Sequence, residues 1–83
     1  MAYYLFSAQT VTAAQRMVQI LQGCGISGQL QRMPSALARQ GCGFAVRVPQ
    51  EDGAEAYRCL TANHLLSKHI YLRENNAYHE VIL

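Results

Sequence analysis

The sequence predicts a small α+β fold in which two helices cover one face of a four-stranded antiparallel sheet. Three observations support this prediction: short aromatic or alternating apolar segments, two segments with apolar residues at helical spacing, and glycine, proline or asparagine residues between them. The 83 residues are 51% hydrophobic and 14% charged, which suits one hydrophobic core and excludes a disordered chain. No segment of about 18 apolar residues occurs, so no membrane-spanning helix is expected.

A strand at residues 3–6 and a helix at about 10–22 are the first predicted elements. The strand is aromatic and apolar, with the sequence YYLF. In the helix, apolar residues recur every three or four positions, and Thr12 with Gln15 resembles a capping box. The glycine-rich segment 23–25 is expected to end the helix, because glycine readily adopts the left-handed conformation of a C-terminal cap.

The middle of the chain is expected to contain two strands separated by a loop. The first strand, at 28–33, is weakly indicated and has Leu30 as its inward side chain. A loop with one helical turn follows at 35–43. The second strand, at 44–48, alternates apolar residues with Arg47, which is the pattern of a half-buried strand.

The last third of the chain is expected to supply a second helix and at least one strand. Asp52 can cap the helix, which extends to about Asn63. A strand at 70–72 and a turn at 74–76 follow. Residues 77–83 are consistent with either a further short strand or a docked tail.

These elements follow the order β-α-β-β-α-β, with a short C-terminal extension. That order is the ferredoxin-like or split βαβ arrangement. We expect a single domain over residues 1–83. The N-terminal residues lack the basic and apolar regions of a signal peptide.

The chain contains three cysteines: Cys24, Cys42 and Cys59. Small secreted proteins usually contain an even number, so free thiols in a reducing cytoplasm are the simpler expectation. One disulfide between two of the three is the alternative.

The charges are distributed unevenly between the two halves of the chain. Residues 1–50 carry four arginines and no acidic residue, whereas all five acidic residues follow position 50. This asymmetry favours an anionic partner for the first half, although scattered arginines also simply keep a small protein soluble. The charge is too sparse for a typical nucleic-acid binder, which has a dense basic stripe.

Cys42 is the strongest candidate for chemistry. Gly41 and Gly43 flank it, which leaves the thiol accessible and exposes backbone N–H groups, and its nearest ionisable neighbours in the sequence are Arg39 and Arg47. A reactive thiolate needs access and positive potential, so we expect a thiol pKa below the value of about 8.5 for free cysteine. The alternative is a tight turn in which Cys42 is a small buried residue.

The other two cysteines and the histidines are weaker candidates. Cys24 also lies between glycines and could act as a resolving thiol for Cys42, although a position at the end of the first helix explains it as well. Cys59 lies within the second helix, where a structural role is expected. No metal site is expected, because there is no Cys-x2-Cys pair and no histidine pair at ligand spacing.

RNA-binding modules share the predicted topology, and Tyr3, Tyr4 and Phe6 on the first strand raise that alternative. In those modules the strand that begins near residue 44 carries stacking aromatic residues, but Cys42 and Arg47 occupy those positions here. We therefore do not expect nucleic-acid binding.

Four short segments of the chain form a recognisable pattern: Gly25-Ile26, Cys42-Gly43-Phe44-Ala45, Pro49-Gln50-Glu51-Asp52 and Ile70-Tyr71. With these segments, the chain from Tyr3 to about Arg73 resembles a family of small bacterial selenium/sulfur carrier-like proteins. The loop between Pro34 and Cys42 is one residue longer than in that family, and residues 77–83 have no counterpart in it.

The resemblance implies a cytoplasmic carrier that accepts sulfur or selenium on Cys42 as a persulfide or its selenium analogue and then passes it on. Gly41, Gly43, Arg39 and Arg47 would stabilise the anion. The expected partners are a protein donor and a protein acceptor, with no cofactor and no membrane. Such a protein is a carrier and not an enzyme in the strict sense.

Two alternative functions and one mode of assembly stay open. The protein could be a thiol redox or sensor protein that uses Cys42 with Cys24, or a non-catalytic interaction or regulatory module. A homodimer could form through the weak strand at 28–33 or through the apolar tail at 81–83, because an edge strand with unpaired N–H groups favours pairing.

Overall fold

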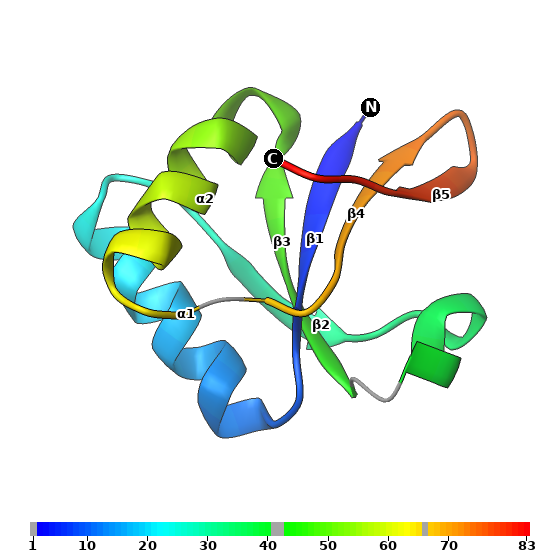
Figure 1. The fold of residues 1–83 in the computed structure, drawn as a ribbon, viewed down its shortest axis with the longest axis horizontal. Coiled ribbons are helices and arrows are strands. Elements are labelled where there is room, and N and C mark those ends of the chain that lie inside the picture. The colour runs from blue at the N-terminus through cyan, green and yellow to red at the C-terminus, as the bar shows by residue number, and fades with distance from the viewer. Residues whose placement is uncertain (1, 41–42, 66) are drawn as a thin grey trace.

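The computed structural model describes residues 2–40, 43–65 and 67–83. In these residues two α-helices pack on a five-stranded antiparallel sheet, with the strands in the order β2-β3-β1-β4-β5 (Figure 1). Neither helix has the length and hydropathy that a membrane span needs. The elements in chain order are β1 (Tyr3–Ala8), α1 (Val11–Gly23), β2 (Gln29–Arg32), the 3-10 helix η1 (Ser35–Gln40), β3 (Phe44–Pro49), the 3-10 helix η2 (Gln50–Asp52), α2 (Gly53–Ala62), β4 (Ile70–Glu74) and β5 (Ala77–Glu80).

The N-cap of helix α1 lies two residues before Thr12, the first residue of the predicted capping pair. Thr10 is the N-cap, and its hydroxyl accepts a hydrogen bond of 3.1 Å from the Ala13 N–H. Thr12 is already inside the helix, so the predicted capping role of Thr12 and Gln15 is wrong. The backbone of Thr10 is extended, which is the conformation an N-cap residue requires.

The end of α1 confirms the predicted role of glycine. Gly25 has a φ of +79°, and its N–H donates to the Gln22 carbonyl at 3.0 Å. The Ile26 N–H reaches back to the Leu21 carbonyl at 2.9 Å. These two bonds form a Schellman motif, which explains why a Gly-Ile pair ends this helix.

Helix α2 follows the 3-10 helix η2 directly. Asp52 precedes the helix, as expected, but its side chain makes no capping hydrogen bond, so that part of the prediction is wrong. The 3-10 turn leads the chain into α2, and the Gly53 N–H donates to the Gln50 carbonyl. The helix buries one side, through Ala56, Cys59 and Leu60.

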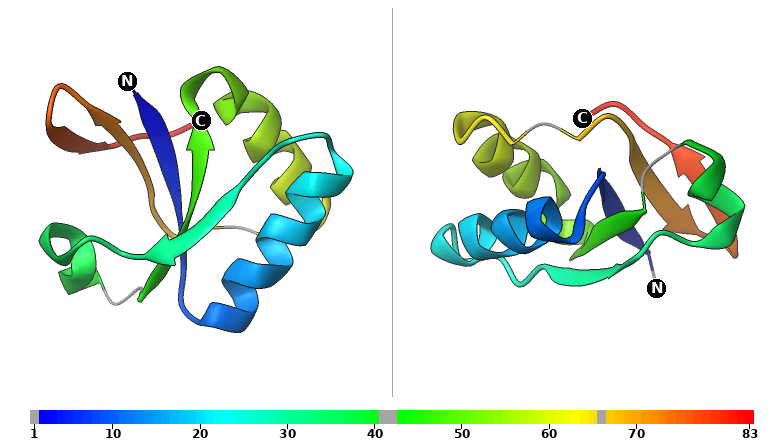
Figure 2. Two further views of the ribbon diagram at one scale, coloured as in Figure 1. Left: turned by 180° about the vertical axis from the view of Figure 1, so that it is seen from behind. Right: turned by 90° about the horizontal axis from the view of Figure 1, so that it is seen from below.

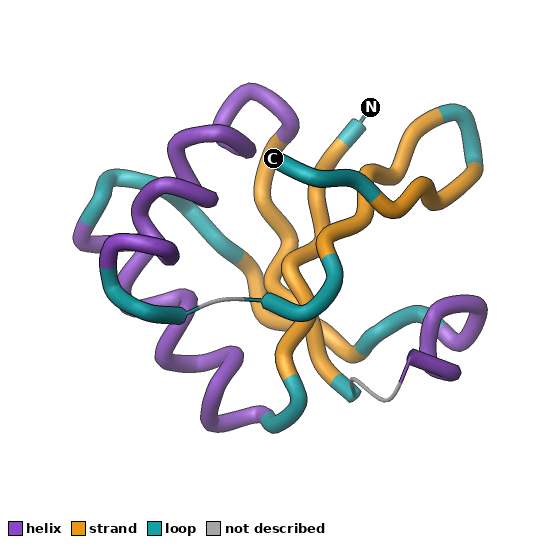
Figure 3. The backbone as a smooth tube through the Cα atoms, viewed as in Figure 1, coloured by secondary structure: helices purple, strands orange, loops and turns teal. Residues whose placement is uncertain are grey.

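The sheet contains one strand more than the four predicted. Asn75 and Asn76 both have positive φ values, 53° and 63°, and Glu74 pairs with Ala77 across them. A two-residue turn of this kind joins antiparallel strands, and asparagine tolerates it better than most residues. Strand β5 therefore pairs with β4 in a hairpin (Figure 3), and only residues 81–83 form a tail.

The first four strands and the two helices are compatible with the ferredoxin-like arrangement, because β1 lies between β3 and β4 and β2 lies outside β3. Both α-helices lie on one side of the sheet, and η1 lies on the other (Figure 2). Leu30 was expected to point inward. It pairs with Val46 on the helical side but is 39% exposed, because β2 is an edge strand.

Each face of the sheet has its own hydrophobic cluster. The larger cluster, between the sheet and the helices, includes Phe6, Leu21 and Val46, which are all almost fully buried. The opposite face carries no α-helix, and we call it the helix-free face. Its smaller cluster is formed by Leu5, Met33, Ala45 and Tyr71, and Leu37, Tyr3 and Tyr78 pack against it.

Candidate functional site

The predicted reactive residue Cys42 and its neighbour Gly41 lie outside the described residues. Arg39 lies within η1, and only its backbone is among the described parts of the chain. The surroundings of this segment are therefore given by η1 on one side and by Gly43 on the other.

Helix η1 is anchored on the helix-free face of the sheet. The Leu37 N–H donates to the Pro34 carbonyl at 2.9 Å, which begins the predicted single helical turn. The Leu37 side chain then packs against the smaller hydrophobic cluster. Pro34 is the second residue after β2, so this packing holds the loop against the sheet.

Gly43 marks the other end of the loop and directly precedes β3. Its carbonyl accepts a hydrogen bond of 3.0 Å from the Met33 N–H, which extends the pairing of β2 with β3 by one step. Gly43 is exposed, and a Cβ atom built there would meet no atom within 4 Å. A partner molecule can therefore approach the chain at this point.

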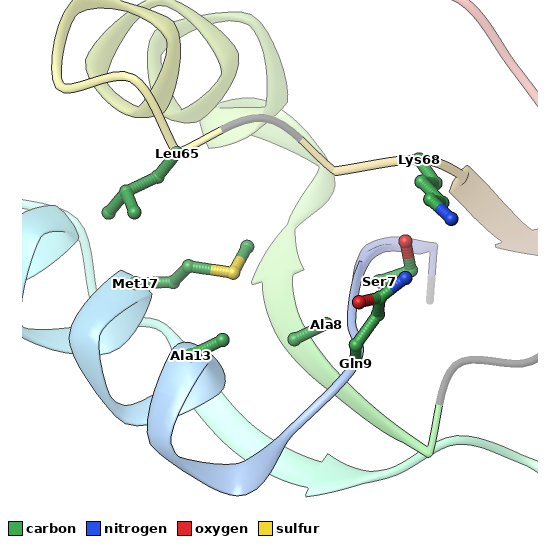
Figure 4. A pocket seen from close by; sticks show the side chains of 7 residues that line it. All are labelled: Ser7, Ala8, Gln9, Ala13, Met17, Leu65 and Lys68. Carbon is green, nitrogen blue, oxygen red and sulfur yellow. The ribbon is translucent and has the colours of Figure 1, made fainter.

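A pocket of about 240 Å³ opens at the same end of the sheet. Phe44, which follows Gly43, pairs with Ala8 at the end of β1, and Ala8 lines the pocket. Figure 4 shows an apolar side formed by Ala13, Met17 and Leu65, facing a polar side with Lys68. The complete lining is Ser7, Ala8, Gln9, Ala13, Met17, Leu65 and Lys68.

Two hydrogen bonds fix the polar side of this pocket. The Ser7 N–H donates to the His69 carbonyl at 3.0 Å, and the Ser7 hydroxyl accepts from the His69 N–H at 3.0 Å. This exchange joins the end of β1 to the segment that carries Lys68. Sequence reasoning missed Lys68, because no motif links it to the loop and only the strand register brings the two segments to one end of the sheet.

Arg47 lies on the helix-free face of the sheet, as the alternation of β3 predicts. Its guanidinium carbon is 4.0 Å from the centre of the Tyr3 ring. Arg47 is three residues beyond Phe44 along β3, which is about 10 Å at the usual strand rise. The structure therefore does not bring Arg47 together with Gly43.

Cys24 and Cys59 are joined by a disulfide, with their Cα atoms 6.6 Å apart. Cys24 is the C-cap of α1 and Cys59 lies within α2, so the bond ties the two helices together. The expectation of free thiols is therefore wrong for these two residues, and the role of Cys59 is more than packing.

The disulfide also affects the expected role of Cys24 as a resolving thiol. Cys24 could resolve a bond to Cys42 only after its own disulfide had opened. The packing of α1 beside α2, which sequence spacing does not reveal, brings the pair within reach.

The described residues contain no group of three or more His, Cys, Asp or Glu side chains that could hold a metal ion. Among them, the His69 side chain pairs with Glu80: the Nδ1 atom of His69 lies 2.7 Å from the Oε2 oxygen of Glu80. Its ring also stacks on Tyr71, with the ring centres 6.0 Å apart. These two contacts give His69 a structural role near Ser7 and Lys68.

Comparison with known proteins identifies the class of this chain. The family model described as "Putative Se/S carrier protein-like" matches residues 3–72, so the chain belongs to that family and the sequence resemblance is confirmed. The match extends from β1 into β4 and leaves out β5 and the tail. No curated protein and no solved structure gives a significant match.

Proposed function

We propose that this protein carries a sulfur or selenium atom on Cys42 and passes it from a protein donor to a protein acceptor. The observation that carries the proposal is the family match over residues 3–72, which includes Cys42. Two features support it: Gly43, the chain neighbour of Cys42, is exposed with open space around it, and the loop on the other side is anchored by Leu37. We also infer that β1 to β4 with the two helices form a ferredoxin-like domain that presents this loop.

The transfer is a thiol exchange. The Cys42 thiolate attacks the outer sulfur of a donor persulfide, R–S–SH, and a new S–S bond forms as the donor's S–S bond breaks. The electron pair of the broken bond leaves with the donor as the thiolate R–S⁻, and Cys42 becomes Cys–S–SH. An acceptor thiolate then attacks the outer sulfur in the same way and restores the Cys42 thiolate. No external oxidant or reductant is needed, and selenium takes the place of the outer sulfur in the analogous transfer.

Positive charge and backbone N–H groups would favour the thiolate and the anionic persulfide. We propose that the amides of Gly41 and Gly43 and the side chain of Arg39 supply this stabilisation. Lys68, on the pocket at the same end of the sheet, is an additional candidate. Arg47 is the weaker candidate, because its guanidinium is stacked on Tyr3 farther along β3.

Mass spectrometry after incubation with a cysteine desulfurase and cysteine tests the proposal. The double variant Cys24→Ala/Cys59→Ala keeps Cys42 as its one cysteine and should gain about 32 Da for each sulfur accepted. Cys42→Ser, which retains the disulfide, should gain nothing. With selenocysteine as the substrate, the adduct should show the isotope pattern of selenium. Failure of both the unaltered protein and the double variant to form an adduct would refute the proposal.

The Cys24–Cys59 disulfide favours a second candidate function, in which Cys42 takes part in redox exchange. A Cys42 thiolate that attacks this bond would join one of the two sulfurs and release the other as a thiolate, with no net oxidation. Peptide mapping of protein trapped with acid distinguishes this function from sulfur carriage. A peptide that links Cys42 to Cys24 or Cys59 supports redox exchange, and a persulfide on Cys42 with the original disulfide intact contradicts it.

A further inference from the structure

Two arginines and two tyrosines form a continuous row on the helix-free face of the sheet. Arg47 comes from β3, Tyr3 from β1, Arg73 from β4 and Tyr78 from β5. In the strand register Tyr3 lies opposite Arg73, and Arg73 lies opposite Tyr78. We call these four residues the arginine–tyrosine belt.

The members of the belt hold one another in place. The guanidinium carbon of Arg47 is 4.0 Å from the centre of the Tyr3 ring, and that of Arg73 is 4.7 Å from the centre of the Tyr78 ring. A side-chain hydrogen bond joins the two tyrosines. Burial, followed by this hydrogen bond and the nearby Tyr78, raises the pKa of Tyr3, although Arg47 and Arg73 oppose the change. The belt is therefore a connected cluster and not four independent side chains.

The two positive charges of the belt have no carboxylate partner among the described residues. The ion pairs found there are Arg58 with Glu55 and His69 with Glu80. A guanidinium that stacks on a ring uses its flat face, and its N–H groups point outward along the edge, where they can bind a carboxylate in a two-pronged geometry. The belt is therefore complementary to pairs of carboxylates.

A groove of about 490 Å³ extends the belt beyond Tyr3 and Arg47. Ser27, Gln29 and Gln50 add hydroxyl and amide groups to its lining, and Glu51 adds a single carboxylate. The two α-helices lie on the other side of the sheet (Figure 2), whereas the side chains of the belt belong to the helix-free face. This part of the surface can receive an extended polar segment.

We propose that the arginine–tyrosine belt is the docking surface for an acidic segment of the protein that donates sulfur or selenium to this chain. The inference rests on the proposed function and names the chemistry of the partner. A standard protein interface covers about 800 Å² on each side, which is a patch roughly 30 Å across. The whole molecule measures 30 × 25 × 19 Å. A protein seated on the belt therefore also reaches the end of the sheet where Gly43 lies.

The belt suits carboxylates better than nucleic acid. It contains two arginines, whereas nucleic-acid surfaces usually carry a dense basic stripe. One face of each tyrosine ring is already covered by a guanidinium, which limits the stacking of bases. Arg73 and Tyr78 also lie beyond residues 3–72, so the family match does not account for half of the belt.

Binding of a fluorescein-labelled octaglutamate peptide, measured by fluorescence anisotropy, tests the charge complementarity. Arg47→Gln and Arg73→Gln should each weaken binding roughly two- to fivefold, and added salt should weaken it further. Arg16→Gln on the opposite side of the fold removes the same charge from an exposed position and should leave binding nearly unchanged. Equal weakening by Arg16→Gln, absence of peptide binding, or stronger belt-dependent binding of an octauridine oligonucleotide would overturn the proposal.

The rate of sulfur loading from two different donors distinguishes a failure of this docking proposal from a failure of the proposed function. The Cys42 thiolate can take a sulfane sulfur from inorganic polysulfide, which leaves one sulfur shorter, without any protein donor. The variant Arg73→Gln should load from polysulfide as fast as the unaltered protein but roughly two- to fivefold more slowly from a cysteine desulfurase. Equal rates from the desulfurase would overturn the docking proposal, and failure to load from polysulfide would refute carriage on Cys42 instead.

Discussion

Removal of the Cys24–Cys59 disulfide should destabilise the protein strongly. The two cysteines are 35 residues apart in the sequence, and the bond closes the segment that contains β2, η1 and β3. For a loop of this length, the chain-entropy relation gives about 4 kcal/mol of stabilisation at 25 °C. The melting temperature of a domain of this size falls by about 4–8 °C per kcal/mol, so Cys24→Ala/Cys59→Ala should melt roughly 15–30 °C lower.

Thermal and urea unfolding followed by circular dichroism measure this loss. The unaltered protein should shift to the behaviour of the double variant when a phosphine reductant is added, and the double variant should not respond to the reductant. Cys42→Ser is the matched control, because it removes a cysteine without touching the disulfide, and it should respond to reduction like the unaltered protein. Equal midpoints for the oxidised and the reduced protein would show that the bond does not constrain the unfolded chain as we infer.

Two further predictions concern the packing of α2 and the ionisation of the belt. A Cβ atom on Gly53 would collide with the ring of Tyr4, so Gly53→Ala should destabilise the protein by about 1–3 kcal/mol in urea unfolding, whereas Gly23→Ala, which has open space, should not. Because the pKa of Tyr3 is raised in the folded protein, its contribution to stability is complete below the unfolded pKa of about 10 and is lost as the pH rises above it. The alkaline fall in stability should therefore be smaller in Tyr3→Phe than in the control Tyr57→Phe, and an equal fall would contradict the assignment.

The order of the elements could be predicted because it depends on local patterns. Apolar spacing located α1, the alternation around Arg47 located β3, and the predicted turn at 74–76 contains the tight turn at Asn75 and Asn76. These signals need only the residues of the element itself. The fifth strand stayed ambiguous because β5 is short and its pairing depends on β4.

The contacts between elements could not be predicted in the same way. The Cys24–Cys59 bond requires α1 to lie beside α2, and the belt requires Tyr78 to pair beside Arg73. The alternation of β3 did predict that Arg47 faces away from the helices, but not that a tyrosine from β1 lies beneath it. Sequence separation hides such neighbours until the strand order is known.

The central position of β1 has a consequence for synthesis on the ribosome. This strand is made before its partners β3 and β4, which begin at Phe44 and Ile70, so its two edges are paired only later. In the finished fold Leu5 and Phe6 are almost fully buried. Until β4 has emerged, one edge of this apolar strand stays unpaired and is open to association with other nascent chains. The exposed edge of β1 is therefore closed only when β4 joins the sheet.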